Sequence, residues 1–180
     1  MFRDSRPRAP LFGLLLLLLF TATVLHAQAP SDSTQRDPPE RVWASLGLGA
    51  GTGATWAGVI GGWYSRGAFA IGVEYSEVQP QWSADRHNSA ALVLGARTSG
   101  DRFFLVGGVG PAAARFLTDC KGACQLHQVG SQPLALGFSG QAVVDAPLLG
   151  LTLGTFGALG TRRVSYAGVA LSVALGWFGK

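Results

Sequence analysis

Apolar and very small side chains alternate strictly along the end of the chain, from Tyr166 to Phe178. One face carries only glycine, alanine and serine over residues 168–176. Successive side chains of a β-strand point to opposite faces, so the segment is predicted to be a strand with one apolar and one nearly bare face. Few polar groups lie on either side, which favours a wall between lipid and a narrow interior. The apolar face consists of Val169, Leu171, Val173, Leu175 and Trp177.

Seven earlier segments are also predicted to be strands, and most of the eight are nine residues or longer. A tilted membrane strand needs about 9–11 residues, whereas strands in general average about 5–6. Two of the eight, the second and the fifth, alternate poorly, and their register stays open. The predicted strands are Arg41–Gly49, Thr55–Tyr64, Ala68–Glu77, Ser89–Arg97, Arg102–Arg115, Pro133–Val144, Leu148–Gly160 and Val164–Phe178.

The connections between the predicted strands differ in length, and the strands that alternate clearly each have an apolar face. Tight turns are predicted at residues 65–67, 98–101 and 145–147, and longer loops at 78–88 and 116–132. Short turns on one side and long loops on the other are typical of outer-membrane barrels. We therefore expect the tight turns and both termini in the periplasm. The apolar faces are predicted to carry Val42, Ala44, Leu46 and Leu48; Phe69, Ile71, Val73 and Tyr75; Ala90, Leu92, Leu94 and Ala96; Leu134, Leu136 and Phe138; and Leu149, Leu151 and Leu153.

The first 29 residues are typical of a secretory signal peptide. Three arginines precede an apolar run from Leu11 to Leu25, and small residues follow at Ala27 and Ala29. A basic leader, a short apolar segment and a small-residue cleavage site define such a signal, with cleavage expected after Ala27 or Ala29. The run is short for a retained membrane anchor. Residues 30–40 are polar and predict a flexible periplasmic lead-in, so residues 41–180 form the predicted barrel domain.

Composition agrees with a membrane barrel and argues against nucleic acid as a partner. The chain has 14 basic and 10 acidic residues, and without the leader's Arg3, Arg6, Arg8 and Asp4 the balance is 11 against 9. No basic cluster interleaved with aromatics appears. Charged residues are only 13% of the chain, and glycine occurs 26 times, which is unusual for a soluble protein. Since no second long apolar run exists, a mature protein in a membrane would have to be a closed barrel.

Aromatic residues gather near the predicted strand ends, where amphipathic rings favour the membrane interface. An ordinary core of aromatics in a soluble barrel is the alternative, although it does not explain this grouping. The outer rim is predicted to include Trp56, Tyr75, Phe116 and Tyr166. The periplasmic rim is predicted to include Trp43, Trp63, Tyr64, Phe103 and Trp177, together with Phe69, Phe104 and Phe178.

With these features the chain resembles the small eight-stranded outer-membrane barrels of the OmpA and OmpX type. The resemblance covers the signal peptide and residues 41–178, and it implies an all-β, antiparallel up-and-down transmembrane barrel. Members usually end in an aromatic residue that assists insertion by the barrel-insertion machinery, and Trp177 holds the matching register. The chain departs from this pattern by continuing through Phe178, Gly179 and Lys180.

The predicted interior face is rich in small residues. Of its 27 positions on five strands, 19 are Gly, Ala, Ser or Thr, whereas an eight-stranded barrel is just wide enough for side chains to fill. Either larger side chains and the poorly assigned strands fill the space, or a narrow cavity or pore remains. Glu74, Arg97 and Gln141 are the candidate polar residues of the lumen. A buried carboxylate needs a partner or a proton, and a structural ion pair is expected for Glu74.

Two cysteines, Cys120 and Cys124, lie in the longest predicted loop. Exported proteins meet an oxidising compartment, and Gly122 allows a tight bend between them, so a disulfide is predicted. A metal site would need more ligands than the nearby His127 supplies. No metal or cofactor is expected.

Two further groups of residues each have a functional interpretation and a simpler one. Lipid A deacylases carry a His-x-Ser pair and an acid, and this chain has His87 and Ser89, followed by Asp101. Twelve extended residues separate Ser89 and Asp101 by nearly 40 Å at about 3.3 Å each, so no triad can close. Arg162 and Arg163 in the last loop could contact lipopolysaccharide phosphates or be solvated.

The sequence thus predicts a monomeric barrel of the cell outer membrane, in contact with membrane lipid and lipopolysaccharide. A structural or surface-interaction role without chemistry of its own is expected. The alternatives are a narrow small-solute channel or ligand-binding barrel, a soluble exported lipocalin-like barrel, and a lipid A-modifying enzyme.

Overall fold

The computed structural model describes residues 40–52, 56–79, 85–100, 102–118, 127–146, 149–161 and 164–178, with backbone only at 127–129. The chain divides into a unit of residues 1–36 and a unit of residues 37–180, and all described residues belong to the second. The predicted signal peptide, and the lead-in up to residue 39, lie outside the described residues.

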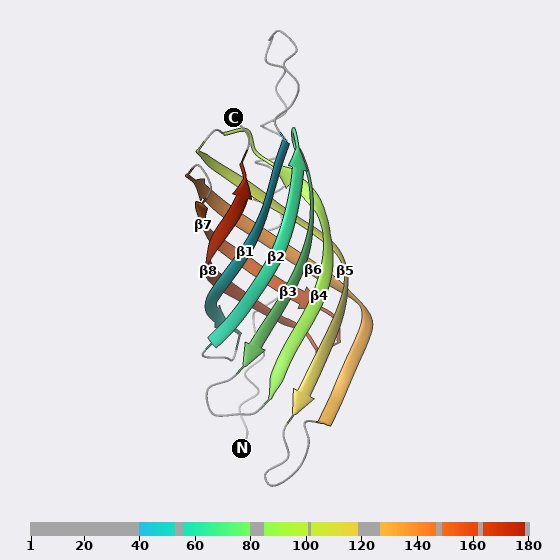
Figure 1. Cartoon of the computed structure of the whole chain (residues 1–180). Coiled ribbons are helices and arrows are strands. Elements are labelled where there is room, and N and C mark those ends of the chain that lie inside the picture. Colours follow the sequence, from blue (N-terminus) through green and yellow to red (C-terminus); the bar gives the residue numbers. More distant parts are fainter. Residues whose placement is uncertain are drawn as a thin grey trace, which may run out of the picture. The chain divides into compact units, whose positions relative to one another are not determined.

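Eight antiparallel strands close into a barrel in which each strand pairs with its neighbours in the sequence, and β1 pairs with β8 (Figure 1). The all-β, up-and-down architecture predicted from the sequence is confirmed. The strands are β1 (Glu40–Gly51), β2 (Trp56–Arg66), β3 (Phe69–Gln79), β4 (Arg86–Arg97), β5 (Phe103–Thr118), β6 (His127–Asp145), β7 (Leu149–Leu159) and β8 (Tyr166–Trp177).

The connections between strands define two ends of the barrel. We call the end with mostly shorter connections the turn end and the opposite end the loop end. The turn end carries the start of β1, the end of β8 and the connections 67–68, 98–102 and 146–148. The loop end carries the connections 52–55, 80–85, 119–126 and 160–165. At the turn end, Gly67 has a φ of 59°, a conformation that glycine adopts without the steric cost of a side chain.

The largest difference from the predicted strand ends is at β4, β5 and β6, which extend further toward the loop end. β6 begins at His127 rather than Pro133, and β4 begins at Arg86 rather than Ser89. Pro133 lies at an irregularity of the β5–β6 ladder, where Ala112 pairs with Ala135 but Ala114 pairs with Gln132. Two residues of β6 therefore oppose one of β5. Proline cannot donate to a ladder and is tolerated at such a bulge, so the strand continues past it.

The outward face of the barrel is apolar, as the alternation predicts. The five apolar residues of β8 are between 44% and 71% exposed, whereas Ala170, Ser172 and Ala174 on the opposite face are buried. β1, β3, β4, β6 and β7 follow the same pattern, with Val42, Leu46, Leu48, Phe69, Val73, Leu92, Leu94, Leu136, Leu149, Leu151 and Leu153 all exposed. In a soluble barrel these residues would face the core.

No helix in the described part of the chain is long and apolar enough to cross a membrane.

Candidate functional site: the barrel interior

The interior of the barrel contains two hydrophobic clusters, one toward each end. The turn-end cluster includes Trp43, Trp63 and Phe104, and the loop-end cluster includes Phe156 and Tyr166. Ala91 on β4 packs against both clusters. Aromatic side chains from β1, β2, β5, β7 and β8 thus occupy the space that the small residues of the neighbouring strands leave.

Stacked aromatic rings form the turn-end cluster. Trp43 and Trp63 are adjacent across β1 and β2, and their rings are 6.1 Å apart and nearly parallel. Phe104 meets the Trp43 ring edge-on at 5.5 Å, and Phe178 packs on it at 6.2 Å. All four are no more than 5% exposed. Centroid distances in this range are typical of favourable aromatic pairs.

This arrangement corrects the predicted periplasmic girdle. Trp43 and Trp63 were expected at the membrane interface, but both are only 2% exposed and point inward, as do Phe104 and Phe178. The physical reason is strand parity: Trp43 alternates with the outward Val42, and Trp63 with the half-buried Tyr64. Phe103 and Trp177 are 56% and 71% exposed on the outward face, so for these two and Tyr64 the interface role stays a prediction.

Glycines opposite the aromatic rings make this packing possible. A Cβ built on Gly72 would lie 2.6 Å from the Trp63 ring, and one on Gly168 would lie 2.5 Å from the Phe156 ring. Real Cβ atoms do not approach other heavy atoms so closely. The small residues of the interior face therefore make room for aromatic rings from other strands, and they do not leave an empty lumen.

Two buried arginines flank Phe104 at the turn end. The guanidinium of Arg41 lies 4.5 Å from the ring centroid and that of Arg97 lies 5.4 Å from it, within the range of cation–π contact. Arg41 also donates to the carbonyl oxygen of Gly100, and Arg97 donates through Nε and Nη2 to that of Gly67. Each arginine thereby fixes one turn across the mouth of the barrel.

Glu74 and Gln141 are two further polar residues buried inside the barrel. Glu74 is 7% exposed, and its Oε2 accepts a hydrogen bond of 2.6 Å from Ser139 Oγ across the lumen. Gln141, also 7% exposed, accepts a long bond of 3.5 Å from Trp43 Nε1. The ion pair expected for Glu74 is not found among the described residues, whose salt bridges are Glu40–Arg66 and Glu77–Arg86. A hydroxyl donor satisfies the carboxylate instead.

A cluster of hydroxyl groups lies inside the barrel toward the loop end. The phenol oxygen of Tyr166 lies 2.8 Å from Ser76 Oγ and 2.7 Å from Ser89 Oγ, and it donates to the backbone carbonyl of Ser76 at 3.1 Å. The His87 ring lies 4.7 Å from that of Phe116 and 5.9 Å from that of Tyr166. Tyr166 was expected at the outer rim but is 4% exposed, because its hydroxyl has partners inside the barrel.

The described residues contain no assembled nucleophile. Ser89 bonds to Tyr166, and no hydrogen bond joins it to His87 in the described part of the chain. An acid nearer to His87 than Asp101 is Asp85, which lies two residues before His87 in the sequence but was not among the predicted site residues. Asp85 accepts a hydrogen bond from Thr118. Within the described ranges no group of three His, Cys, Asp or Glu residues could hold a metal.

Several predicted site residues lie outside the described part of the chain. These are Cys120 and Cys124 with their predicted disulfide, Asp101, and the pair Arg162 and Arg163. His127 is described only by its backbone. Their roles remain predictions.

Comparison with solved structures places the fold among small outer-membrane barrels. Neisserial surface protein A has a TM-score of 0.57 at 13% identity, over 78% of this chain and 99% of that one. Ail of Yersinia pestis, solved with the heparin analogue sucrose octasulfate, has 0.53 at 7% identity, over 78% and 99%. The N-terminal barrel domain of Pseudomonas aeruginosa OprF has 0.52 at 11% identity, over 79% and 100%.

The fold is therefore that of the small eight-stranded outer-membrane barrels, as the sequence resemblance predicted. No family model matches the sequence, and no curated protein sequence matches it either.

Proposed function

We propose that the protein is an outer-membrane barrel that acts through its surface or as a structural element, with neither a solute path nor chemistry of its own. The observation that carries the proposal is the combination of an apolar outward wall with an interior filled by side chains. The apolar wall suits contact with lipid, and the packed interior leaves the outer wall and the two ends of the barrel as the parts available to other molecules.

Support for the membrane location comes from the exposed residues themselves. Leu46, Leu134, Leu153 and Leu171 are each more than 60% exposed, and burial of a leucine side chain in an apolar phase is worth about 1.5–3 kcal/mol. A soluble lipocalin-like barrel would direct these residues inward. The similarity to outer-membrane barrels of three bacteria supports the same location.

The filled interior weighs against the alternative of a narrow channel. Trp43, Trp63 and Phe104 lie across the turn end, and the Tyr166 hydroxyl cluster lies toward the loop end. A solute would have to displace stacked rings and break buried hydrogen bonds. The lack of an assembled nucleophile among the described residues likewise weighs against a lipid A-modifying enzyme.

Quenching of tryptophan fluorescence by brominated lipid tests the membrane location residue by residue. Variants that retain one tryptophan each are refolded into vesicles, with heat-modifiable gel mobility as the check of folding. The variant that retains Trp177 should be strongly quenched, because that ring is 71% exposed on the wall. Variants that retain Trp43 or Trp63 should be quenched weakly. Absence of quenching at Trp177 in folded protein would exclude a lipid-facing wall.

A further inference from the structure

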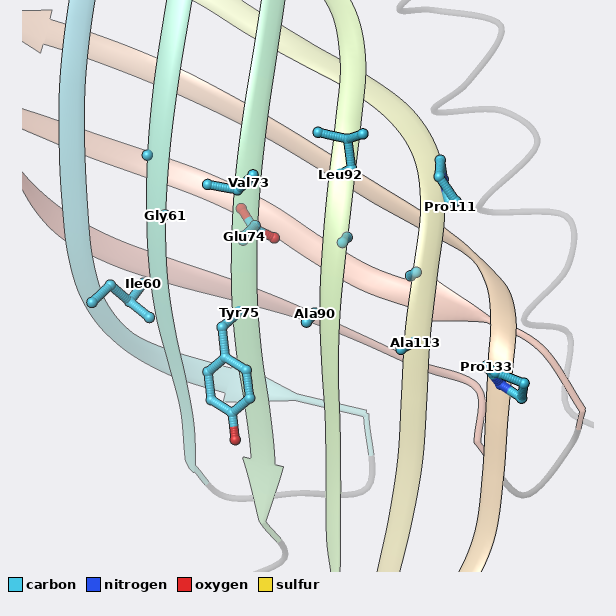
Figure 2. Close-up of a pocket in the computed structure, with 13 residues that line it drawn as sticks. Ile60, Gly61, Val73, Glu74, Tyr75, Ala90, Leu92, Pro111, Ala113 and Pro133 are labelled. Atoms are coloured by element: carbon cyan, nitrogen blue, oxygen red, sulfur yellow. The ribbon is translucent and has the colours of Figure 1, made fainter.

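A proline interrupts the hydrogen bonding between β4 and β5 in the middle of the barrel wall. The register of these two strands is continuous except at two successive pairs, which would join Leu92 to Pro111 and Val93 to Gly110. Pro111 has no N–H, so it cannot donate to the carbonyl of Leu92 as a regular antiparallel pair would. Leu92 and Pro111 lie on the two adjacent strands in Figure 2.

The interruption lies in the part of the wall that faces lipid under the proposed function. One row of paired residues crosses the sheet here and is exposed on the outward face: Val73, Leu92, Pro111 and Leu136. In the hydrocarbon of a bilayer no water replaces a missing backbone hydrogen bond. A Cβ built on Gly110 would overlap the carbonyl oxygen of Leu92. That oxygen therefore lies against the glycine Cα, whose C–H is a much weaker donor than an N–H.

The other side of β5 is irregular as well. Its ladder with β6 shifts in register between Ala112 and Ala114, close to Pro133. The six ladders that do not involve β5 run through the described residues without a missing pair. The least complete backbone pairing in the described wall therefore borders the middle of β5.

Large side chains do not support β4 and β5 from inside at this level of the barrel. The rings of Phe104 and Phe116 on β5 are both six residues away from Gly110, one in each direction. The hydrogen bond between Glu74 and Ser139 crosses the lumen from β3 to β6 and bypasses both strands. The lumen-facing residues behind the interruption are Ala91, Val93, Gly110 and Ala112.

The outer wall has two broad hollows, and only one of them coincides with missing hydrogen bonds. The first is lined by Leu92 and Pro111, and also by the lumen-facing residues Ala91 and Ala112. The second lies mostly over β8, β1, β2 and β3, whose ladders with one another are complete. The second hollow therefore serves as the comparison for the first.

We propose that β4 and β5 part locally at Leu92 and Pro111 and open the barrel wall sideways toward the lipid. Local separation of strands begins where hydrogen bonds and buried contacts are fewest. The opening exposes the lumen-facing Ala91 to molecules dissolved in the bilayer, while both ends of the barrel stay packed and no axial path forms. The inference rests on the proposed function only in that the wall must face lipid.

Thiol labelling of a lumen-facing cysteine from the lipid phase tests this opening. Ala91→Cys is compared with Ala174→Cys, which faces the lumen on β8 between two complete ladders, in the full chain with Cys120 and Cys124 replaced by serine. In vesicles, lipid-soluble N-phenylmaleimide should modify Ala91→Cys about tenfold faster than Ala174→Cys, and a membrane-impermeant sulfonated maleimide should modify neither. Equal rates with N-phenylmaleimide would overturn the proposal. Rapid modification of Ala91→Cys by the sulfonated reagent would also overturn it, because the route would then be through an end of the barrel.

A second substitution tests whether the missing hydrogen bond is the cause. Pro111→Val restores an N–H opposite Leu92, and it should slow modification of Ala91→Cys about tenfold, as expected for one regained backbone hydrogen bond. Pro133→Val is the matched control, because it replaces the proline at the irregularity between β5 and β6, and it should leave the rate unchanged. A rate that Pro111→Val does not change, or that Pro133→Val slows equally, would refute an opening between β4 and β5.

Heat-modifiable mobility confirms the folding of each variant, and Pro111→Ala, which restores the same N–H, replaces a Pro111→Val variant that does not fold. The outcome can be separated from a failure of the proposed function. If the opening is refuted while Trp177 is still quenched by brominated lipid, the membrane location stands. Loss of that quenching in folded protein would refute the proposed function itself.

Discussion

At the scale of single residues, the interior is built from pairs of one large and one very small side chain. Gly72 on β3 lies opposite Trp63 on β2, and Gly168 on β8 lies opposite Phe156 on β7. In each pair a methyl group would collide with the ring. The packing therefore requires glycine at these two positions, although the sequence alone does not distinguish them from glycines of a low-complexity segment.

Gly72→Ala should destabilise the barrel, because the new Cβ would lie 2.6 Å from the Trp63 ring. Overpacking of this kind costs about 1–3 kcal/mol. Gly62→Ala is the matched control, since its Cβ would meet only Val73 Cγ2 at 3.7 Å, and alanine in a strand is favoured over glycine. Urea unfolding in vesicles measures both free energies. Equal effects of the two substitutions would contradict the ring-and-glycine account.

Ser139→Ala should lower the free energy of unfolding by about 1–3 kcal/mol, because it leaves buried Glu74 without its hydrogen-bond donor. The comparison variant is Thr152→Val. Its buried Oγ1 has no hydrogen-bond partner among the described residues, so this substitution should be neutral or stabilising. Urea unfolding in vesicles again measures both free energies of unfolding. An equal decrease in Thr152→Val and Ser139→Ala would contradict a stabilising role for the hydrogen bond between Ser139 and Glu74.

At the scale of strands, contacts across the lumen join elements that are not neighbours in the barrel wall. Tyr166 on β8 bonds to Ser76 on β3 and Ser89 on β4, and Ser139 on β6 bonds to Glu74 on β3. Strand pairing alone connects each strand only to its two neighbours. These ties are expected to fix the cross-section of the barrel near its middle and toward the loop end.

Tyr166→Phe should weaken the loop half of the barrel, since it removes three hydrogen bonds from the hydroxyl. We expect a loss of about 1–3 kcal/mol and faster amide hydrogen exchange in the loop-end halves of β3, β4 and β8. Tyr75→Phe is the control, because that hydroxyl is exposed and bonds to Glu77. Unchanged exchange in Tyr166→Phe would mean that the cluster does not hold the strands together.

The number of strands and the outward face were predictable because both depend on periodicity within one strand. The alternation of β8 alone places Leu171 and Ser172 on opposite sides. The filling of the lumen was not predictable in the same way, because it depends on register between strands. Only the pairing of Trp43 with Trp63, and of Trp63 with Gly72, shows that the rings stack over bare backbone. Distance from a strand end does not indicate which face of the strand a residue occupies, and for this reason the predicted girdle included Trp43 and Trp63, which face inward.

At the scale of the whole molecule, the two hydrophobic clusters and the Glu74–Ser139 hydrogen bond lie inside the barrel, and we propose that they close it to solutes. The turn end depends most on Trp43, Trp63 and Phe104, with Arg41 and Arg97 fixing turns beside them. Truncation of the three rings to alanine would remove most of the bulk at that end. Such a variant, if it folds, is expected to be less stable and leakier than the wild type.

Single-channel recording in planar bilayers tests the central claim most directly. The current is measured across bilayers that contain wild-type protein with confirmed heat-modifiable mobility, beside the Trp43→Ala, Trp63→Ala, Phe104→Ala triple variant. The filled interior predicts a silent wild type and conductance steps in the folded triple variant. Stable conductance steps from correctly folded wild-type protein would contradict it and establish an open path through the lumen.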